Sequence, residues 1–377
     1  MRKNLFKKVL ALTLASTMAF SMAGCGSKGG SSDAKNGDGT ITLNVWHQWS
    51  NDTNELKSKY EEAVKAYEKE NSGVKIKTET LDTEAYKTKI NAEFAGDAKG
   101  IDVFYWWGAG TAKKLVDAGK VMALDDYVTD DVKSKILEGS TSAFEFDGKL
   151  YSVPMFSWYM TLFCNKTMFD KAGATLPTTY DELVDAVKKL KKLDGVTPMA
   201  AGAKDGWNAA FVYQALALRE VGATGVNEML SGKKEFGDEG FKKAAQKVSD
   251  LYEMGAFGDN PLEQGNDDAN AAFENGKAAM RLMGSWFANN VYTDDAATIK
   301  PEEVVALKIP TIADGKGEAT DYCGGFVESF WVNNNTKYKE EAAKFCIYIN
   351  EKMGVASYET GSGFSGWTTP ADESNLN

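Results

Sequence analysis

The fold is decided by residues 41–76, ITLNVWHQWSNDTNELKSKYEEAVKAYEKENSGVKI. At residues 41–45 apolar and polar side chains alternate, which is typical of a strand, and residues 74–76 repeat the pattern after a glycine turn. Between them, one helical face carries Leu56, Tyr60, Ala63, Val64 and Tyr67. A helical crossover joins strands that pair in parallel. The stretch therefore predicts an α/β protein.

The same alternation of strands and helices continues along the chain and restarts after Pro154. A Thr179–Glu182 capping box opens one helix. The other expected elements are helices at 86–94, 112–118, 211–219, 240–254, 267–275 and 342–352, strands at 101–105, 161–165, 278–283 and 304–309, and a hairpin at 144–151. We therefore expect two α/β lobes, with ligands at the carboxyl ends of the strands.

The N-terminal residues predict export. Residues 1–8 are basic, residues 9–20 are almost wholly apolar, and Ala-Gly-Cys ends at Cys25. The last three residues resemble a bacterial lipobox, in which the cysteine is lipidated. We expect a signal peptide at 1–24, a lipid on Cys25, a flexible Gly/Ser-rich tether at 25–39 and an extracytoplasmic location on the cell membrane. A plain secretory signal cut near Ala23 is the alternative.

Composition excludes several functions. The 377 residues carry a net charge of -11, and the first 24 contain four basic residues and no acid, so the remainder is more acidic still. Such a surface argues against nucleic acid as a partner. One histidine and the absence of any Cys-x-x-Cys pair argue against a metal site or a cofactor. Three cysteines remain after Cys25, and whether any two pair is left open.

Tryptophans are the strongest functional signal. Trp46 follows the first strand, Trp106 and Trp107 follow the third, and Trp286 follows the strand at 278–283. Indole rings at strand ends can stack on the C–H faces of a sugar, while polar groups bind its hydroxyls. The alternative is that each tryptophan is simply a large core residue. His47 is a candidate ligand donor or a half-exposed histidine at a strand end.

Charged groups favour an uncharged ligand and no catalysis. Beyond residue 24 the chain has two arginines, Arg219 and Arg281, although arginine forks are the usual grip on phosphate and carboxylate. The acidic pairs at 125–126, 181–182 and 267–268 stand near expected helix starts, where carboxylates favour the helix dipole. We therefore assign no catalytic residue.

Several motifs together resemble the solute-binding proteins of bacterial ABC sugar importers, a family that includes maltose- and multiple-sugar-binding proteins. Their order and spacing extend over most of residues 1–370. Besides the lipobox, they are ITLNVW at 41–46, IDVFYW at 101–106, DGKLYSVP at 147–154, LFCNK at 162–166, LPTTYDEL at 176–183, FENGKAAM at 273–280 and GSW at 284–286.

The resemblance implies a periplasmic-binding-protein-like fold with a ligand cleft between two lobes that close by a hinge. It places crossing segments near 154–158 and 305–310, lobe 1 at 40–155 and 308–365, and lobe 2 at 156–307 and 366–377. Members usually continue past 361–370 with another helical segment, so the end at Asn377 suggests a truncated second lobe. The ligand-binding residues expected from the strand ends and the resemblance are Trp46, His47, Gln48, Trp106, Trp107, Trp158, Trp207 and Trp286.

The function expected is that of a receptor and not of an enzyme. It would capture a neutral mono- or oligosaccharide and deliver it to the transmembrane permease subunits of an ABC importer. The resemblance also implies a monomer. Two alternatives stay open: a cell-surface glycoside hydrolase or lyase that uses a carboxylate pair, and a receptor for a polyamine, since aromatic rings also bind cations.

Overall fold

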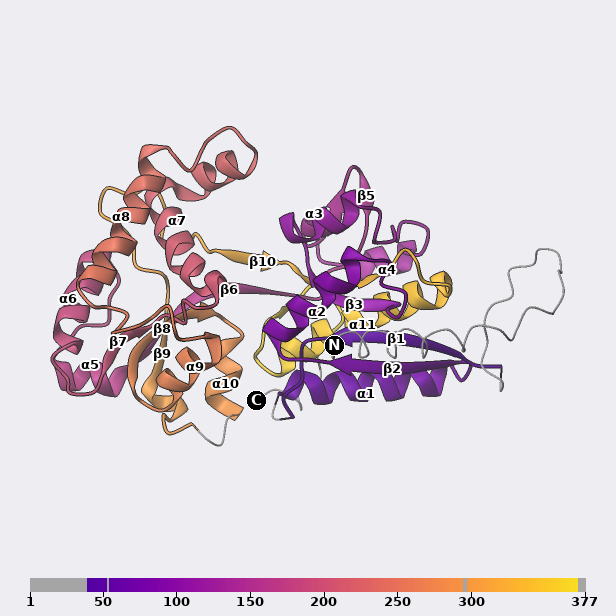
Figure 1. The fold of residues 1–377 in the computed structure, drawn as a ribbon, viewed down its shortest axis with the longest axis horizontal. Helices are drawn as coiled ribbons and strands as arrows, with labels where there is room; N and C mark the ends of the chain where they lie inside the picture. The colour runs from indigo at the N-terminus through magenta and orange to yellow at the C-terminus, as the bar shows by residue number, and fades with distance from the viewer. Residues whose placement is uncertain (1–38, 53, 294–296, 372–377) are drawn as a thin grey trace, which may run out of the picture. The chain divides into compact units, whose positions relative to one another are not determined.

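The computed structural model describes residues 39–52, 54–293 and 297–371. The expected signal peptide, the lipid site at Cys25 and most of the tether lie outside this range, as do residues 372–377. The described chain is α/β, with one sheet of four strands, one of six and a separate hairpin (Figure 1). Within these residues, no helix is both long enough and apolar enough to cross a bilayer.

The first sheet has the order β11-β3-β1-β2. Its strands are β1 (Ile41–His47), β2 (Val74–Thr80), β3 (Val103–Trp107) and β11 (Glu328–Val332). β1 pairs in parallel with both β2 and β3, which confirms the predicted strand–helix–strand unit, and β11 pairs antiparallel with β3. The helices of this part are α1 (Glu55–Glu70), α2 (Thr83–Ala95), α3 (Gly110–Asp117), α4 (Asp130–Lys135) and α11 (Lys339–Glu359).

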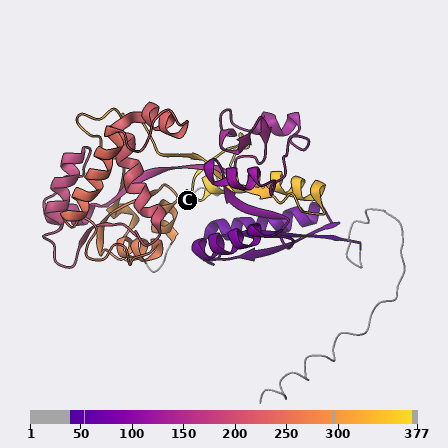
Figure 2. The same cartoon turned by 45° about the horizontal axis from the view of Figure 1, so that its top comes forward.

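Segments from both ends of the described chain build this first part. α11 packs against α1 and β11, and both views show α11 (yellow) among the indigo and purple elements (Figures 1 and 2). The hairpin of β4 (Glu145–Phe146) and β5 (Lys149–Leu150) is confirmed. Its turn places Asp147 at φ 51° and Gly148 at φ 75°, the left-handed conformation that a two-residue hairpin loop requires.

The second sheet is built around one long strand, β6 (Phe156–Asn165). β8 (Ala278–Gly284), β9 (Val304–Leu307), β10 (Gly324–Phe326) and β12 (Phe364–Ser365) all pair with β6, and β7 (Thr197–Ala200) pairs with β8. The accompanying helices are α5 (Lys166–Ala172), α6 (Tyr180–Leu190), α7 (Gly206–Leu230), α8 (Glu239–Glu253), α9 (Asn266–Glu274) and α10 (Phe287–Thr293), and two short 3-10 turns occur at Ser142–Phe144 and Pro301–Glu303.

Local chemistry sets where several helices begin. The Asn54 and Asp82 side chains accept hydrogen bonds from amides of the first turns of α1 and α2. The capping box of α6 is confirmed, because the Glu182 amide donates to Thr179 Oγ1 at 3.2 Å and the Thr179 amide donates to Glu182 Oε2 at 3.1 Å. These side chains satisfy amides that a helix start leaves without partners.

Some elements differ from the sequence prediction. β6 begins at Phe156 instead of 161, so it includes Trp158. α7 continues to Leu230, although Gly222 has a non-helical φ of 71° inside it. β11 was not predicted as a strand: all five of its residues are buried, but Glu328 and Ser329 hide the apolar pattern. Burial on both faces removes the alternation by which a strand is recognised.

The two sheets have separate hydrophobic cores. The first core takes its residues from 41–156, 330–353 and Trp367, and the second from 160–309. The chain returns from the second sheet to the first between β10 and β11, at 326–328, because β9 and β10 still pair with β6 whereas β11 pairs with β3. This pairing favours a crossing there over the expected one near 305–310. The lobe ranges given above stay predictions.

Candidate ligand-binding site

The nine tryptophans separate by burial into two sets. Five are buried and belong to the first core: Trp46, Trp49, Trp106, Trp331 and Trp367. Four are only partly buried: Trp107, Trp158, Trp207 and Trp286. We call these four the tryptophan group. Partly buried indoles keep ring surface available to a ligand, so this group is the candidate site.

Members of the tryptophan group lie at strand and helix ends. Trp107 is the last residue of β3, Trp158 is the third of β6, and Trp207 is the second of α7. Trp286 follows β8 by two residues, and its ring stands nearly perpendicular to that of Trp158, with centroids 4.7 Å apart. The ring of Trp286 folds back over Gly284, where a Cβ atom would lie 1.9 Å from Trp286 Cζ3. Gly284 therefore permits the orientation of Trp286.

Phe211 joins three members of the group, although it was not predicted. Its ring stacks on Trp158 at 5.6 Å between centroids and meets Trp207 edge-on at 5.2 Å and Trp286 at 6.2 Å. Phe211 lies four residues after Trp207 on the same helix, and residues at this spacing share a helical face. That spacing was the signal available in the sequence.

Glu328 joins Trp107 and Trp158, and sequence reasoning missed it. The Trp107 Nε1–H and the Trp158 Nε1–H both donate to Glu328 Oε1, at 3.2 and 3.1 Å. The side chain is 5% exposed. Burial raises the pKa of Glu328 to about 8, and the positive charge of Lys87 opposes this rise only in part. A carboxyl in this environment is largely protonated at neutral pH.

Lys87 completes a closed circuit of contacts. Its Nζ lies 5.2 Å from the ring centroid of Trp107 and 5.2 Å from that of Trp207. Lys87 also pairs with Glu84 at 2.8 Å, and the Trp207 Nε1–H donates to Glu84 Oε1 at 3.1 Å. The circuit runs from Trp107 through Glu328, Trp158, Phe211, Trp207 and Lys87 back to Trp107. Aromatic faces and a few polar groups thus converge, as in small-molecule sites.

The other predicted site residues lie elsewhere. His47 is 1% exposed and not half-exposed: its Nδ1 accepts from the Trp49 amide at 3.2 Å, and its ring lies 4.2 Å from that of Tyr60. Burial lowers the pKa of His47 to about 3, and Lys57 adds to this effect. Within the described residues, His47 makes no ring contact or hydrogen bond with the tryptophan group.

Among the described residues Trp46, Gln48 and Trp106, only Trp106 has a ring contact with a member of the tryptophan group. Trp46 is buried under the Nζ of Lys89, at 4.5 Å from its ring centroid, and Gln48 is partly exposed. Trp106 is buried, with its ring 5.3 Å from that of Trp107. Whether these three and His47 contact a ligand stays a prediction.

The two arginines beyond residue 24 have structural roles. Arg219 donates to the backbone carbonyls of Ile309, Glu318 and Asp321. Arg281 is 1% exposed, and its guanidinium donates to Asn208, Asn266 and Asn270 and to two backbone carbonyls. Both guanidinium groups are therefore engaged by the protein itself.

The described residues contain no group of three or more His, Cys, Asp or Glu side chains that could hold a metal ion. Cys164, Cys323 and Cys346 are free thiols. Cys164 and Cys346 are buried, and burial raises the pKa of the Cys346 thiol to about 12. Thiols in this state are poor nucleophiles and poor metal ligands.

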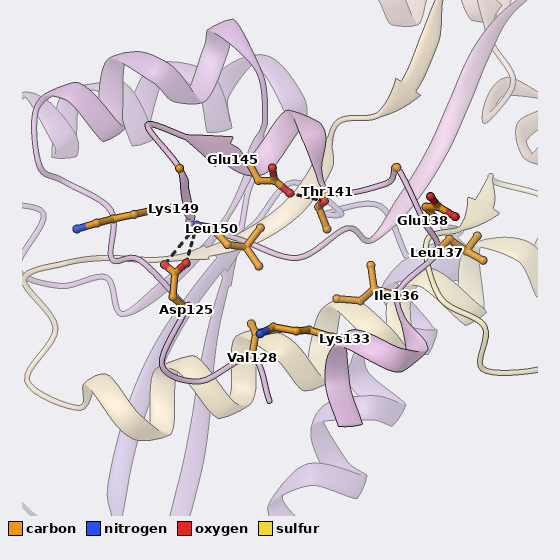
Figure 3. A pocket seen from close by; sticks show the side chains of 12 residues that line it. Asp125, Val128, Lys133, Ile136, Leu137, Glu138, Thr141, Glu145, Lys149 and Leu150 are labelled. Carbon is orange, nitrogen blue, oxygen red and sulfur yellow. Dashed lines mark hydrogen bonds between the residues drawn. The ribbon is translucent and has the colours of Figure 1, made fainter. Parts of the chain in front are cut away.

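A hollow of about 430 Å³ on the first part of the chain does not include the tryptophan group (Figure 3). It is lined by residues between 125 and 150, with charged side chains of both signs around it. Asp125 accepts from the Leu150 amide at 3.3 Å, and Glu145 accepts from Thr141 Oγ1 at 2.5 Å. These contacts hold the hairpin in place, so we assign the hollow a structural role.

The chain belongs to the family of bacterial extracellular solute-binding proteins, whose family model matches residues 50–355. A solved structure from a study of xylan utilization by the thermophilic bacterium Caldanaerobius polysaccharolyticus is 36% identical, with a TM-score of 0.83 over 89% of this chain and 85% of that one. A chitin oligosaccharide binding protein superimposes with a TM-score of 0.76 at 22% identity over 89% and 84% of the two chains.

Comparison with curated protein sequences also places the chain among solute-binding proteins. The multiple sugar-binding protein of Streptococcus mutans is 23% identical over 368 residues, which are 94% of this chain and 80% of that protein. The predicted family and the periplasmic-binding-protein-like fold class are thereby confirmed. Members of this family are substrate-binding receptors.

Proposed function

We propose that this protein is the receptor of an ABC importer that captures a neutral mono- or oligosaccharide outside the cell. In this proposal the sugar binds between two lobes at the tryptophan group, and the closed receptor delivers it to the transmembrane permease. The lipid on Cys25 would hold the receptor at the cell membrane, and the protein would act as a monomer without catalysis.

The closed circuit of the tryptophan group is the observation that carries the proposal. Four partly buried indoles and Phe211 meet at one place and come from β3, β6, α7 and the segment after β8. Indole faces pack against the C–H surface of a sugar, and the polar groups at their edges can bind its hydroxyls. The solved structure from the study of xylan utilization supports a xylan fragment as the first ligand to test.

The charges at the site support an uncharged ligand. Both arginines are engaged elsewhere, so no guanidinium fork is offered to an anion. Lys87 already lies over Trp107 and Trp207, the position that a cationic ligand would need. These two observations make anions and polyamines poorer ligands than sugars.

Closure requires energy that such a site can supply. To change an open-to-closed population from 99:1 to 1:99, a ligand must favour the closed form by about 5.5 kcal/mol. The C–H faces of a sugar that pack on several indoles contribute about 25 cal/mol for each Å² of apolar surface buried. Hydrogen bonds to hydroxyls add about 1 kcal/mol each.

A thermal-shift screen tests the proposal. The panel contains xylo-, chito- and malto-oligosaccharides, the polyamines putrescine and spermidine, and organic acids. We expect a rise in Tm with a neutral sugar alone. A rise only with polyamines or acids would refute the proposal. Reducing-end assays on the same sugars would detect a glycoside hydrolase, and turnover above background would favour that alternative.

Trp286→Ala tests the site itself. We expect calorimetry to give more than tenfold weaker sugar binding, because the change removes an indole that packs on Trp158 and Phe211. Tyr252→Ala is the matched control, since Tyr252 is a 56% exposed aromatic residue of α8 outside the tryptophan group. Equal affinity of the Trp286 variant and the control would exclude Trp286 from the site.

A further inference from the structure

The carboxyl of Glu328 has one oxygen engaged and one free. Oε1 accepts both indole N–H groups, from Trp107 and Trp158. Oε2 is buried and has no hydrogen-bond partner among the described residues. A buried polar atom without a partner costs about 1–3 kcal/mol, so this arrangement calls for an explanation.

The need of the two indole N–H groups for an acceptor does not explain why a carboxyl is buried here. A backbone carbonyl can serve instead: the Trp331 Nε1–H donates to the carbonyl of Trp106 at 3.1 Å, and no ionisable group is buried for it. Ion pairing does not explain it either: Lys87 acts on Glu328 through its charge, but its ammonium pairs with Glu84. Neither the indole hydrogen bonds nor an ion pair accounts for the unpartnered Oε2.

The position of Glu328 puts this oxygen beside the candidate site. Glu328 is the first residue of β11 and lies opposite Trp107 in the pairing with β3. The two indoles that donate to Oε1 hold the carboxyl between Trp107 and Trp158. A ring packed on either indole would therefore lie next to this carboxyl.

We propose that Glu328 is a specificity-determining residue of this receptor: its buried Oε2, which has no partner among the described residues, forms a hydrogen bond with a hydroxyl of the bound sugar. In its neutral form the carboxyl would donate this hydrogen bond. This inference rests on the proposed function and goes beyond it by naming the polar group that selects a hydroxylated ring. A site built to hydrogen-bond a hydroxyl discriminates strongly against a ligand that lacks it, because its own polar group is then left unpaired.

The neutral state follows from the surroundings. No cation is hydrogen-bonded to Glu328 within the described structure, and desolvation disfavours the ionised form. The charged group whose field acts on Glu328 is Lys87 of α2, which pairs with Glu84, while β3 and β6 present indoles. A neutral carboxyl also avoids placing a buried charge against an uncharged ligand.

The test uses the full chain and two substitutions of Glu328, titrated calorimetrically with xylotriose, chitotriose and maltotriose. Glu328→Gln keeps an oxygen for both indoles and an N–H donor in the place of Oε2. Glu328→Met removes both. We expect the Gln variant to bind within about threefold of wild type and the Met variant to bind at least tenfold more weakly. Glu340→Gln on α11, where the carboxylate is exposed, is the control.

A pH comparison covers the case in which the Met variant fails to fold. Between pH 7 and pH 9 the affinity of wild type should fall about tenfold as Glu328 ionises, whereas that of Glu328→Gln should stay constant. Equal wild-type affinity at both pH values would overturn the neutral state, and a folded Met variant that binds like wild type would overturn the contact. If wild type binds no neutral sugar, in these titrations or in the thermal-shift panel, the proposed function fails and this inference fails with it; a wild type that binds a sugar while the Met variant binds it equally well overturns this inference alone.

Discussion

Replacing His47 with asparagine and replacing Glu328 with glutamine should change the slope of the unfolding free energy against pH in opposite directions. His47 has a folded pKa of about 3 against a reference value of 6.5, and Glu328 has one of about 8 against 4.5. His47→Asn keeps an acceptor near the position of Nδ1 for the Trp49 amide, and Glu328→Gln keeps the acceptor for both indoles. Each variant removes one titration; His47→Asn also removes ring contacts with Trp49, Tyr60 and Phe330, a loss that does not depend on pH.

The sign of each effect follows from proton binding. Between pH 3 and 6.5 the unfolded chain binds the His47 proton more tightly than the folded protein does, so this contribution to stability is full above 6.5 and is lost as pH falls. Between pH 4.5 and 8 the folded protein binds the Glu328 proton more tightly, so that contribution is full below 4.5 and is lost as pH rises.

The magnitudes nearly cancel between pH 5 and pH 7. Over this interval His47 contributes a gain of about 2 kcal/mol, and Glu328 contributes a loss of similar size. The two contributions together leave wild type with almost no net slope from this pair. Relative to wild type, His47→Asn should therefore lose about 2 kcal/mol of unfolding free energy from pH 5 to pH 7, and Glu328→Gln should gain about as much.

Urea unfolding followed by tryptophan fluorescence at pH 5, 6 and 7 measures these slopes. Both residues belong to strands of the first sheet, so one transition reports on both. The exposed carboxylate variant Glu340→Gln should keep the wild-type slope. If the profiles of all four proteins run parallel, neither group has the perturbed pKa that its burial implies.

Two further predictions concern stability. In denaturant titrations, Gly324→Ala should lower the free energy of unfolding by about 2 kcal/mol more than Gly325→Ala does. The reason is that a Cβ atom at 324 would lie 2.0 Å from the Trp158 carbonyl oxygen, whereas one at 325 meets nothing within 4 Å. Equal effects would mean that only the positive φ of both glycines matters. Arg281→Lys should lower the free energy of unfolding by about 3 kcal/mol, because an ammonium cannot reproduce the guanidinium's hydrogen bonds to Asn208, Asn266 and Asn270. A Tm equal to that of wild type would show that these hydrogen bonds are not needed for stability.

Local patterns in the sequence were sufficient for much of the fold. The parallel pairing of β1 and β2 follows from residues 41–76, and the α6 capping box and the β4–β5 turn follow from side chains within four residues of each other. β11 escaped prediction because its polar first residues break the apolar pattern of a fully buried strand. Its antiparallel pairing with β3 is a contact between residues more than 200 positions apart, which no local pattern records.

Some residues of the candidate site could be predicted from the sequence, and others could not. Trp107 and Trp286 could be named from the sequence because they stand at predicted strand ends, whereas Trp158 and Trp207 were named through the family resemblance. The group that joins two of them could not, since Glu328 is 221 residues from Trp107 and nothing near it in the chain indicates the contact. Strand-end position also failed to separate Trp106 from Trp107: Val103 to Trp106 are all buried, and only Trp107, the last residue of β3, is partly exposed.

The strand connection at 326–328 gives Glu328 a mechanical role. Trp158 pairs with Gly325 on β10, while Trp107 pairs with Glu328 on β11, and two residues lie between these pairs. A small torsion of the backbone there would shift one indole against the carboxyl and leave the other in place. The carboxyl proposed to bind the sugar thus lies next to the backbone that would rotate. A change of backbone torsion at 326–328 and the binding of a sugar would therefore affect each other directly, without intervening residues.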